Sequence, residues 1–170
     1  RRTAIENVSG EVDIEDLIPE EKCVYTYTSM GYIKRQPVDM FSIQNRGGRG
    51  VKGMTRREED VAETMFTCSS HDFIMFFTTK GKTYRLKGYE IPEGSRTSKG
   101  MNIVNLLPLE ADEKVSAMIR APKDENEEEL FLCMVTRKGI IKRTELAEFK
   151  TNRQTGIIAN KLDEDDELAW

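Results

Sequence analysis

The segment Gln44–Gly50, read QNRGGRG, places two arginines and three glycines within seven residues. Glycine reaches backbone conformations with positive φ and lets another backbone approach closely. The arginine guanidinium presents a rigid fork of donors that suits phosphate oxygens. This composition predicts a loop that lies flat against a polyanion. Because clusters of glycine and arginine are also common in flexible linkers, the segment alone leaves that second interpretation open.

Basic residues are concentrated in three stretches, although the net charge of the 170-residue chain is −4. Residues 31–57 carry a net charge of +6, and residues 80–100 and 137–153 carry +4 each, which leaves −18 for the remainder. Charge in such blocks predicts a basic face that binds a polyanion without reading its sequence. The predicted DNA-binding residues are Lys34, Arg35, Gln44, Arg46, Gly47, Gly48, Arg49, Gly50, Lys52, Arg56, Arg57, Lys80, Lys82, Arg85, Arg96, Lys99, Lys138, Lys142, Arg143 and Arg153.

Nucleotide and catalytic chemistry have little support in the sequence. Residues Gly48–Gly53 match G-x-G-x-x-G, and Thr55–Phe66 behind them could form the helix of a dinucleotide-binding site. That site needs a preceding apolar strand, and Phe41–Arg46 is too short and too polar. The carboxylates cluster in runs without histidine or cysteine beside them. We therefore predict a non-catalytic segment with no metal ion and no cofactor.

The cysteines and the single histidine carry no recognisable site. Cys23, Cys68 and Cys133 have no CxxC spacing, which argues against zinc and against a disulfide framework. We interpret all three as small buried hydrophobic residues in a reducing cytoplasm. His71 lies in a polar turn, where we expect it to face solvent. No apolar run is long enough for a transmembrane helix, so no membrane partner is predicted.

Three β-hairpins recur along the chain. The first joins Lys22–Thr28 to Tyr32–Gln36, and the others span Asp72–Leu86 and Leu130–Thr144. Each has a run of β-branched and aromatic residues, a turn with glycine, and a more basic second strand. The turn glycines, at positions 31, 81 and 139, lie 50 and 58 residues apart. A repeat of this length predicts propeller-like blades.

Each hairpin is followed by a second glycine and then by an acidic segment. Gly50, Gly100 and Gly156 come 19, 19 and 17 residues after the turn glycines, and each ends a polar loop that contains a basic residue. The acidic segments are 58–60, 110–113 and 163–167, and an additional acidic run at 124–129 predicts an exposed loop. Gln44–Gly50 is therefore one member of a series.

The predicted fold is all-β, built of about three repeated four-stranded blades. Phe73–Phe77 is apolar at every position, so neighbouring blades must cover both faces of that strand. The predicted organisation is a lead-in with an N-terminal strand (1–21), unit 1 with the QNRGGRG segment (22–70), unit 2 (71–120) and unit 3 (121–170). The absence of an initial Met and the apolar end of the chain suggest a fragment of a longer protein.

With this loop and repeat, the sequence resembles the C-terminal domain of the DNA gyrase A subunit. The hallmark of that family is the box Q-[RK]-R-G-G-[RK]-G, which Gln44–Gly50 matches except at Asn45, where one basic residue is replaced. The segments EDLIPEE, GYIKR and RGVKGM also resemble the family, and the resemblance covers essentially the whole chain. The lead-in resembles the junction between the breakage-reunion region and this domain.

The resemblance implies a β-pinwheel whose blades exchange strands and whose basic edge wraps double-stranded DNA. Wrapping would present a positive crossover, and the type IIA topoisomerase would use ATP to convert it into negative supercoils. It further implies a bacterial cytoplasmic, nucleoid-associated heterotetramer (A2B2) with an ATPase subunit. The ATP site, the magnesium ligands and the catalytic tyrosine would belong to other parts of the enzyme. The chain has fewer units than the family's disc, so it is either part of a disc or a shortened domain.

Two alternatives remain at this point. The equivalent domain of topoisomerase IV resembles that of gyrase but has a degraded or absent box, and it selects DNA crossings for decatenation. A propeller-type scaffold for protein interactions would need no basic blocks in phase with the repeat.

Overall fold

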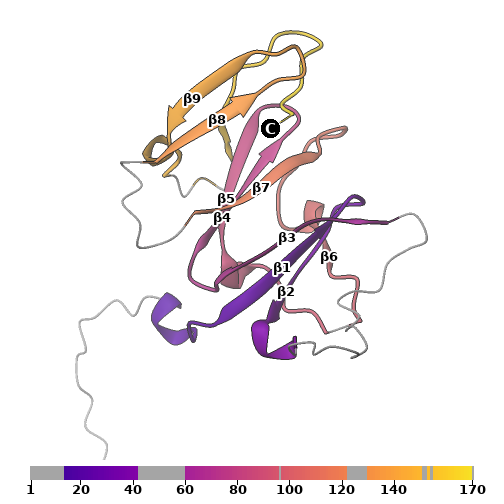
Figure 1. Ribbon diagram of the computed structural model, residues 1–170, viewed down its shortest axis with the longest axis vertical. Coiled ribbons are helices and arrows are strands. Elements are labelled where there is room, and N and C mark those ends of the chain that lie inside the picture. Colours follow the sequence, from indigo (N-terminus) through magenta and orange to yellow (C-terminus); the bar gives the residue numbers. More distant parts are fainter. Residues whose placement is uncertain are drawn as a thin grey trace, which may run out of the picture.

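The structure, a computed structural model, describes residues 14–41, 60–95, 97–121, 130–150, 153 and 155–169. Its regular elements are β-strands and short 3₁₀ helices. The strands form two four-stranded sheets and one two-stranded sheet, which follow one another as layers along the long axis (Figure 1). The predicted all-β fold of repeated, blade-like sheets is confirmed.

The first sheet has the strand order β3-β1-β2-β6. It comprises β1 (Lys22–Thr28), β2 (Tyr32–Pro37), β3 (Ala62–Ser69) and β6 (Met101–Asn102). All its neighbouring strands are antiparallel, and β6 joins through the pairs Tyr32–Asn102 and Ile33–Met101. The fourth strand of this sheet therefore comes from unit 2.

The second sheet repeats this arrangement with the order β10-β5-β4-β7. It comprises β4 (Phe73–Thr78), β5 (Lys82–Lys87), β7 (Val115–Ala121) and β10 (Ile157–Ile158). Both four-stranded sheets have an irregularity at the same place, where the first hairpin strand meets its outer neighbour near the turn. The repeat thus extends to the details of the pairing.

The third sheet consists, within the described residues, of the hairpin β8 (Phe131–Val135) and β9 (Ile141–Glu145). An isolated bridge from Thr136 to Leu168 continues it at the turn. The connections contain the 3₁₀ helices η1 (Ile14–Leu17), η2 (Val38–Met40), η3 (Gly88–Glu90), η4 (Ile103–Asn105) and η6 (Leu146–Phe149).

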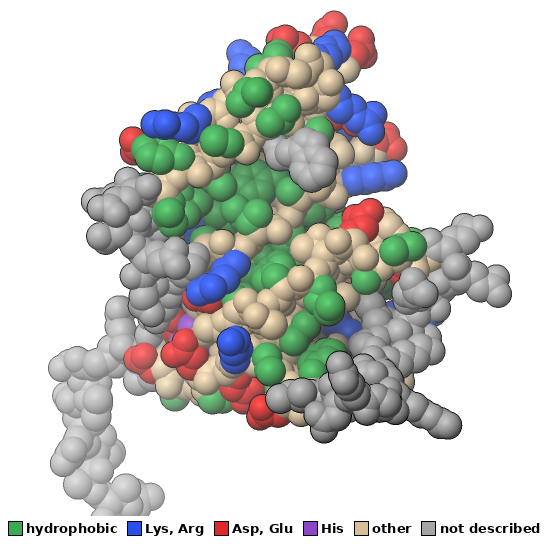
Figure 2. All heavy atoms as spheres, in the orientation of Figure 1, with side chains coloured by type: hydrophobic (Ala, Val, Ile, Leu, Met, Phe, Trp, Pro, Cys, Tyr) green, Lys and Arg blue, Asp and Glu red, His purple; other side chains and the backbone are tan. Residues whose placement is uncertain are grey.

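Two hydrophobic clusters join the three sheets, and β4 contributes to both. Ile74 and Phe76 pack against residues of the first sheet, including Tyr25. Met75 and Phe77 point to the other face, where Phe77 meets Phe149 of the third unit edge to face at 6.3 Å between ring centroids. Figure 2 shows hydrophobic side chains gathered between successive layers. The prediction that this strand is covered on both faces is confirmed.

The hairpin turns share a Thr-x-x-Gly pattern with a repeated set of hydrogen bonds. In unit 1 the Gly31 N–H donates to the Thr28 carbonyl, and the Tyr32 N–H donates to the Thr28 hydroxyl. The turns that end at Gly81 and Gly139 make the same two bonds. All three glycines have φ between 73° and 86°, which L-residues with a side chain rarely adopt. This requirement explains why glycine recurs at this place.

Each acidic segment contributes one buried carboxylate beside a turn. Asp60, Glu113 and Asp166 are 5%, 6% and 7% exposed. Asp60 accepts a hydrogen bond from the Met30 N–H, and Asp166 accepts one from the Lys138 N–H, both at 3.1 Å. Because a buried polar group must be paired, these acids are structural parts of the repeat rather than general surface charge.

The strand exchange places β6 and β10 beyond the predicted unit boundaries. A Cβ added at Gly100, just before β6, would lie 2.3 Å from the carbonyl oxygen of Ile33. A Cβ at Gly156, just before β10, would lie 2.7 Å from Tyr84. These glycines let the exchanged strand approach its partner. The boundaries at 70/71 and 120/121 stay predictions, since each four-stranded sheet draws on two units.

Two expectations from the sequence are wrong, whereas the rejection of a dinucleotide-binding site is supported. Ala62–Ser69 is a strand, so the helix that such a site needs is missing from those residues. Cys133 is exposed, whereas Cys23 and Cys68 are buried. The His71 side chain is only 13% exposed, because its Nε2 lies 2.8 Å from the Ile18 carbonyl oxygen of the lead-in. The N-terminal strand and the acidic loop 124–129 lie outside the described residues.

Candidate nucleic-acid interface

An arginine occupies the same register position in the second strand of every hairpin. Arg35, Arg85 and Arg143 pair with Tyr25, Met75 and Cys133, respectively, on the neighbouring strands. Each arginine follows its turn glycine by four residues. The repeat therefore places an arginine at this register position in each sheet.

The surroundings of these arginines differ. The guanidinium carbon of Arg85 lies 3.7 Å from the ring centroid of Phe73, and that of Arg143 lies 4.1 Å from that of Phe131. Arg35 instead donates from Nε to the Ile91 carbonyl at 3.2 Å, and its side chain is 16% exposed. Stacking on an aromatic face leaves the N–H edge of a guanidinium available for other acceptors. Arg143 is exposed, whereas Arg35 is mainly committed to internal contacts.

Lys34 is a correction to the predicted interface. This residue is 1% exposed, and its ammonium donates to the carbonyls of Ser95 and Ser98 at 3.0 and 3.1 Å. Burial lowers the pKa of this lysine. The loop before β6 covers the side chain, so it cannot reach a phosphate. Lys34 holds that loop against the first sheet.

Lys80 and Lys82 lie at the turn of the second hairpin and share one carboxylate. The Lys80 Nζ lies 3.1 Å from Oε2 of Glu110, and the Lys82 Nζ contacts Oε1 of the same residue. Lys80 also donates to the Ala111 carbonyl at 3.1 Å. Hydrogen bonds from Lys82 and Lys80 lower the pKa of Glu110, and the bond to Glu110 raises the pKa of Lys82. All three side chains remain partly exposed.

The third unit presents its predicted lysines on the outside. Lys138 and Lys142 are exposed, and they donate to the backbone carbonyls of Glu164 at 2.8 Å and Ala159 at 2.9 Å. Lys99 and Arg153 are also exposed, in the loops that precede β6 and β10. These two loops are equivalent in the repeat, so exposed basic residues recur in front of each exchanged strand.

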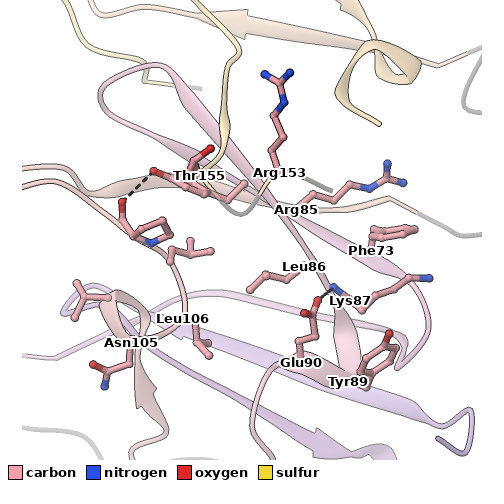
Figure 3. Close-up of a pocket in the computed structure, with 14 residues that line it drawn as sticks. Phe73, Arg85, Leu86, Lys87, Tyr89, Glu90, Asn105, Leu106, Arg153 and Thr155 are labelled. Carbon is pink, nitrogen blue, oxygen red and sulfur yellow. Dashed lines mark hydrogen bonds between the residues drawn. The ribbon is translucent and has the colours of Figure 1, made fainter. Parts of the chain in front are cut away.

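A cavity of about 880 Å³ brings together basic residues from units 2 and 3 (Figure 3). Tyr84, Leu86 and Leu106 contribute to its wall, and Arg85 and Arg153 are the predicted residues that line it. Figure 3 shows Arg85 and Lys87 extending beside Phe73, while Arg153 points away from them. The third cation, Lys87, lies 3.9 Å from the Phe73 ring centroid and 2.9 Å from Glu15.

Sequence reasoning missed Arg137 as an exposed cation and Lys87 as a cation that lines the cavity, with a side chain 14% exposed and its ammonium paired with Glu15. Lys87 follows Arg85 by two residues on the same strand face, which is a detectable signal. Arg137 lies in the third turn beside Lys138, with a side chain 74% exposed and 3.3 Å from Glu167. The remaining predicted contacts, namely Gln44, Arg46, Gly47, Gly48, Arg49, Gly50, Lys52, Arg56, Arg57 and Arg96, lie outside the described residues.

The part of the chain that the structure describes contains neither a candidate metal site nor a candidate membrane-spanning helix. No group of three or more His, Cys, Asp or Glu side chains there could hold a metal ion. No helix among the described residues has the length and apolar character needed to cross a membrane.

Comparison with known proteins decides the family. The model of the family described as "DNA gyrase C-terminal domain, beta-propeller" matches residues 28–69, 72–122 and 131–170. The chain belongs to this family. Each of the three matched segments contains the turn and the second strand of one hairpin, which agrees with a repeated β-pinwheel unit.

Two of the curated relatives of this gyrase C-terminal domain are the following gyrase A subunits. The DNA gyrase A subunit of Clostridium acetobutylicum is 51% identical over 168 residues, which are 99% of this chain and 20% of that protein. The DNA gyrase A subunit of Staphylococcus aureus is 50% identical over 170 residues, or 19% of its length. The chain thus spans about a fifth of the relatives that it matches.

Solved structures show the same fold. The C-terminal domain of DNA topoisomerase IV matches with a TM-score of 0.74 and 26% identity, over 89% of this chain and 45% of the other. The DNA gyrase A C-terminal domain matches with a TM-score of 0.66 and 27% identity, over 87% of this chain and 46% of the other.

Proposed function

We propose that the chain binds double-stranded DNA without reading its sequence and wraps it along a basic edge of the stacked sheets. The observation that carries this proposal is the recurrence of exposed Lys99 and Arg153 in equivalent loops before β6 and β10. The QNRGGRG segment occupies the same place in unit 1 by sequence. We infer that the equivalent loops of successive sheets together form this basic edge.

Phosphate contacts supply the free energy for this binding. Each neutralised phosphate contributes about 0.9 to the slope of log affinity against log salt concentration. Bending a short DNA site costs of order 1–6 kcal/mol, which several such contacts offset. The basic surface binds the backbone of the DNA, so its affinity depends strongly on salt and weakly on sequence.

Within a longer parent protein, the wrapped DNA would form the positive crossover that a gyrase converts into negative supercoils. The gyrase A relatives support this role, and the share of their length that the chain spans supports a non-catalytic module. The catalytic tyrosine and the sites for ATP and magnesium then lie elsewhere in the parent. We also propose an A2B2 assembly with an ATPase subunit in the bacterial cytoplasm.

The two alternatives are less well supported. A topoisomerase IV role finds support in the fold match, but the sequence relatives at 50% and 51% identity are gyrase A subunits. The near-complete QNRGGRG box also favours gyrase. A protein-interaction scaffold does not account for basic blocks in phase with the repeat.

Ligation of nicked plasmid in the presence of increasing amounts of the chain tests the proposal. Wrapping should leave a linking difference of constant sign that grows with the amount of protein. DNA binding without any linking difference would rule out wrapping by this chain, and lack of binding at low salt would favour a scaffold. Changing both Arg46 and Arg49 to Ala should reduce the linking difference more than the affinity. A loss of affinity alone, in proportion to the charge removed, would reduce the box to an ordinary basic patch.

A further inference from the structure

Glu110 lies between two lysines of the proposed DNA-binding surface in a geometry that a phosphate group could also adopt. Each of its carboxylate oxygens contacts one ammonium group, Oε2 that of Lys80 and Oε1 that of Lys82. A phosphate likewise offers two oxygens to two donors. The side chains of Lys80, Lys82 and Glu110 are 40%, 28% and 53% exposed, so solvent and solutes reach all three.

This lysine pair is particular to unit 2. The equivalent turn positions hold Met30 and Tyr32 in unit 1, and Lys138 and Ile140 in unit 3. Lys138 bonds a backbone carbonyl of Glu164, which brings no formal charge to the ammonium. The turn of unit 2 has a lysine on each side of its glycine, and the Glu110 carboxylate contacts both ammonium groups.

The contact of Glu110 with the two lysines lies at an exposed site, where it can exchange. Hydrogen bonds from Lys82 and Lys80 keep the pKa of Glu110 below its ordinary value, so the carboxylate is charged at neutral pH. Ion pairs at an exposed site are nevertheless screened by water and salt and contribute little to stability. A polyanion with many charges can therefore compete for the two ammonium groups.

We propose that Glu110 is an internal counterion that occupies a phosphate position at Lys80 and Lys82 and that DNA must displace to bind this turn. The inference rests on the proposed DNA binding and adds a regulatory element to it. Glu110 weakens the hold of unit 2 on the DNA, so the wrapped segment detaches there more readily than from a turn without the carboxylate.

Glu110→Gln provides the test, because glutamine keeps the shape of the side chain and removes its charge. The net charge of the three side chains then rises from +1 to +2. Affinity for a short fluorescent DNA duplex, measured by anisotropy over a series of salt concentrations, should increase severalfold near physiological salt. The salt slope should become steeper by up to about 0.9.

Asp112→Asn is the matched control. Asp112 is exposed in the same acidic segment as Glu110 and has φ 66°, a conformation that asparagine also tolerates. The substitution removes the same charge but leaves the Glu110 carboxylate in contact with both lysines, so its effect on DNA affinity should be much smaller. Equal effects of the two substitutions would overturn the inference in favour of general surface charge.

A double-mutant cycle tests whether the gain in DNA affinity depends on Lys80 and Lys82. In a background with Lys80→Met and Lys82→Met, Glu110→Gln should no longer strengthen binding, because the cations that it frees are absent. The inference would be overturned if Glu110→Gln strengthened DNA binding equally in that background. It would also be overturned if Glu110→Gln left the DNA affinity at the wild-type value. In both cases the proposed function stands. No duplex binding by any variant at low salt would instead refute the proposed function and the inference with it. Urea unfolding midpoints of all variants verify that they are folded.

Discussion

The carboxylate of Asp166 accepts a hydrogen bond at 3.1 Å from the backbone N–H of Lys138, which precedes it by 28 residues. The Glu167 N–H donates to the same oxygen at 2.9 Å. Asp60 makes the corresponding contact with Met30 in unit 1. A buried acid thus ties the beginning of the next strand to the hairpin turn, which makes the turn part of the packed structure.

The Asp166 contact predicts a specific response to acid. Burial raises the pKa of this carboxyl, but hydrogen bonds from Thr136 and from the backbone of Lys138 and Glu167 outweigh it and leave the pKa below its ordinary value. The stabilisation is therefore complete above the unfolded pKa of about 3.9, and it is lost as the pH falls through the folded value.

Asp166→Asn should flatten the dependence of unfolding free energy on pH in this acidic range. Urea unfolding at a series of pH values measures this dependence. Asp163→Asn, which removes an exposed carboxylate from the same segment, controls for the loss of one negative charge. A curve for Asp166→Asn that runs parallel to that of the wild type would contradict the prediction.

Gly100 and Gly139 separate two reasons why a position requires glycine, namely space and backbone conformation. Both have φ near +85°, but a Cβ would lie 2.3 Å from the Ile33 carbonyl oxygen at Gly100 and would meet nothing within 4 Å at Gly139. Gly139→Ala should cost about 1–2 kcal/mol of unfolding free energy from the backbone conformation alone. Gly100→Ala should cost distinctly more, because β6 must also move away from β2. Similar unfolding midpoints for the two variants would show that the exchanged strand adapts freely.

Lys34 and Lys99 should behave in opposite ways despite their common charge. Lys34→Met removes the buried ammonium that donates to the carbonyls of Ser95 and Ser98, which should lower the unfolding free energy by about 1–3 kcal/mol. The DNA salt slope of the folded variant should not change. Lys99→Met should leave stability intact and make the slope shallower by about 0.9. A shallower slope for Lys34→Met would mean that its ammonium reaches the DNA.

The hairpins were predictable because their signals are local. Runs such as Phe73–Phe77 combine apolar and aromatic residues, and a glycine with positive φ marks each turn. The need to cover both faces of β4 follows from the same run. The β-pinwheel itself is implied by the family resemblance rather than by these patterns.

Whether a single side chain is buried or exposed depends on segments far away in sequence. Lys34 is buried because the loop before β6, more than 60 residues later, closes over it. His71 is covered by the lead-in through Glu15 and Ile18. Cys133 is exposed although Cys23 and Cys68 in comparable strands are buried. Charge and strand patterning give no information about which distant loop covers a side chain.

The equivalent arginines Arg35 and Arg143 offer the sharpest test of how the repeat divides structural and functional roles. Arg143→Gln should make the DNA salt slope shallower by about 0.9, because this side chain is exposed and stacks on Phe131. Arg35→Gln should instead lower the unfolding free energy by about 1–3 kcal/mol, since the Ile91 carbonyl loses its donor. Its effect on the slope should be small. Anisotropy titrations over a salt series and urea unfolding of both variants measure the two quantities. Equal changes in slope would show that register position, rather than exposure, determines which arginine contacts DNA.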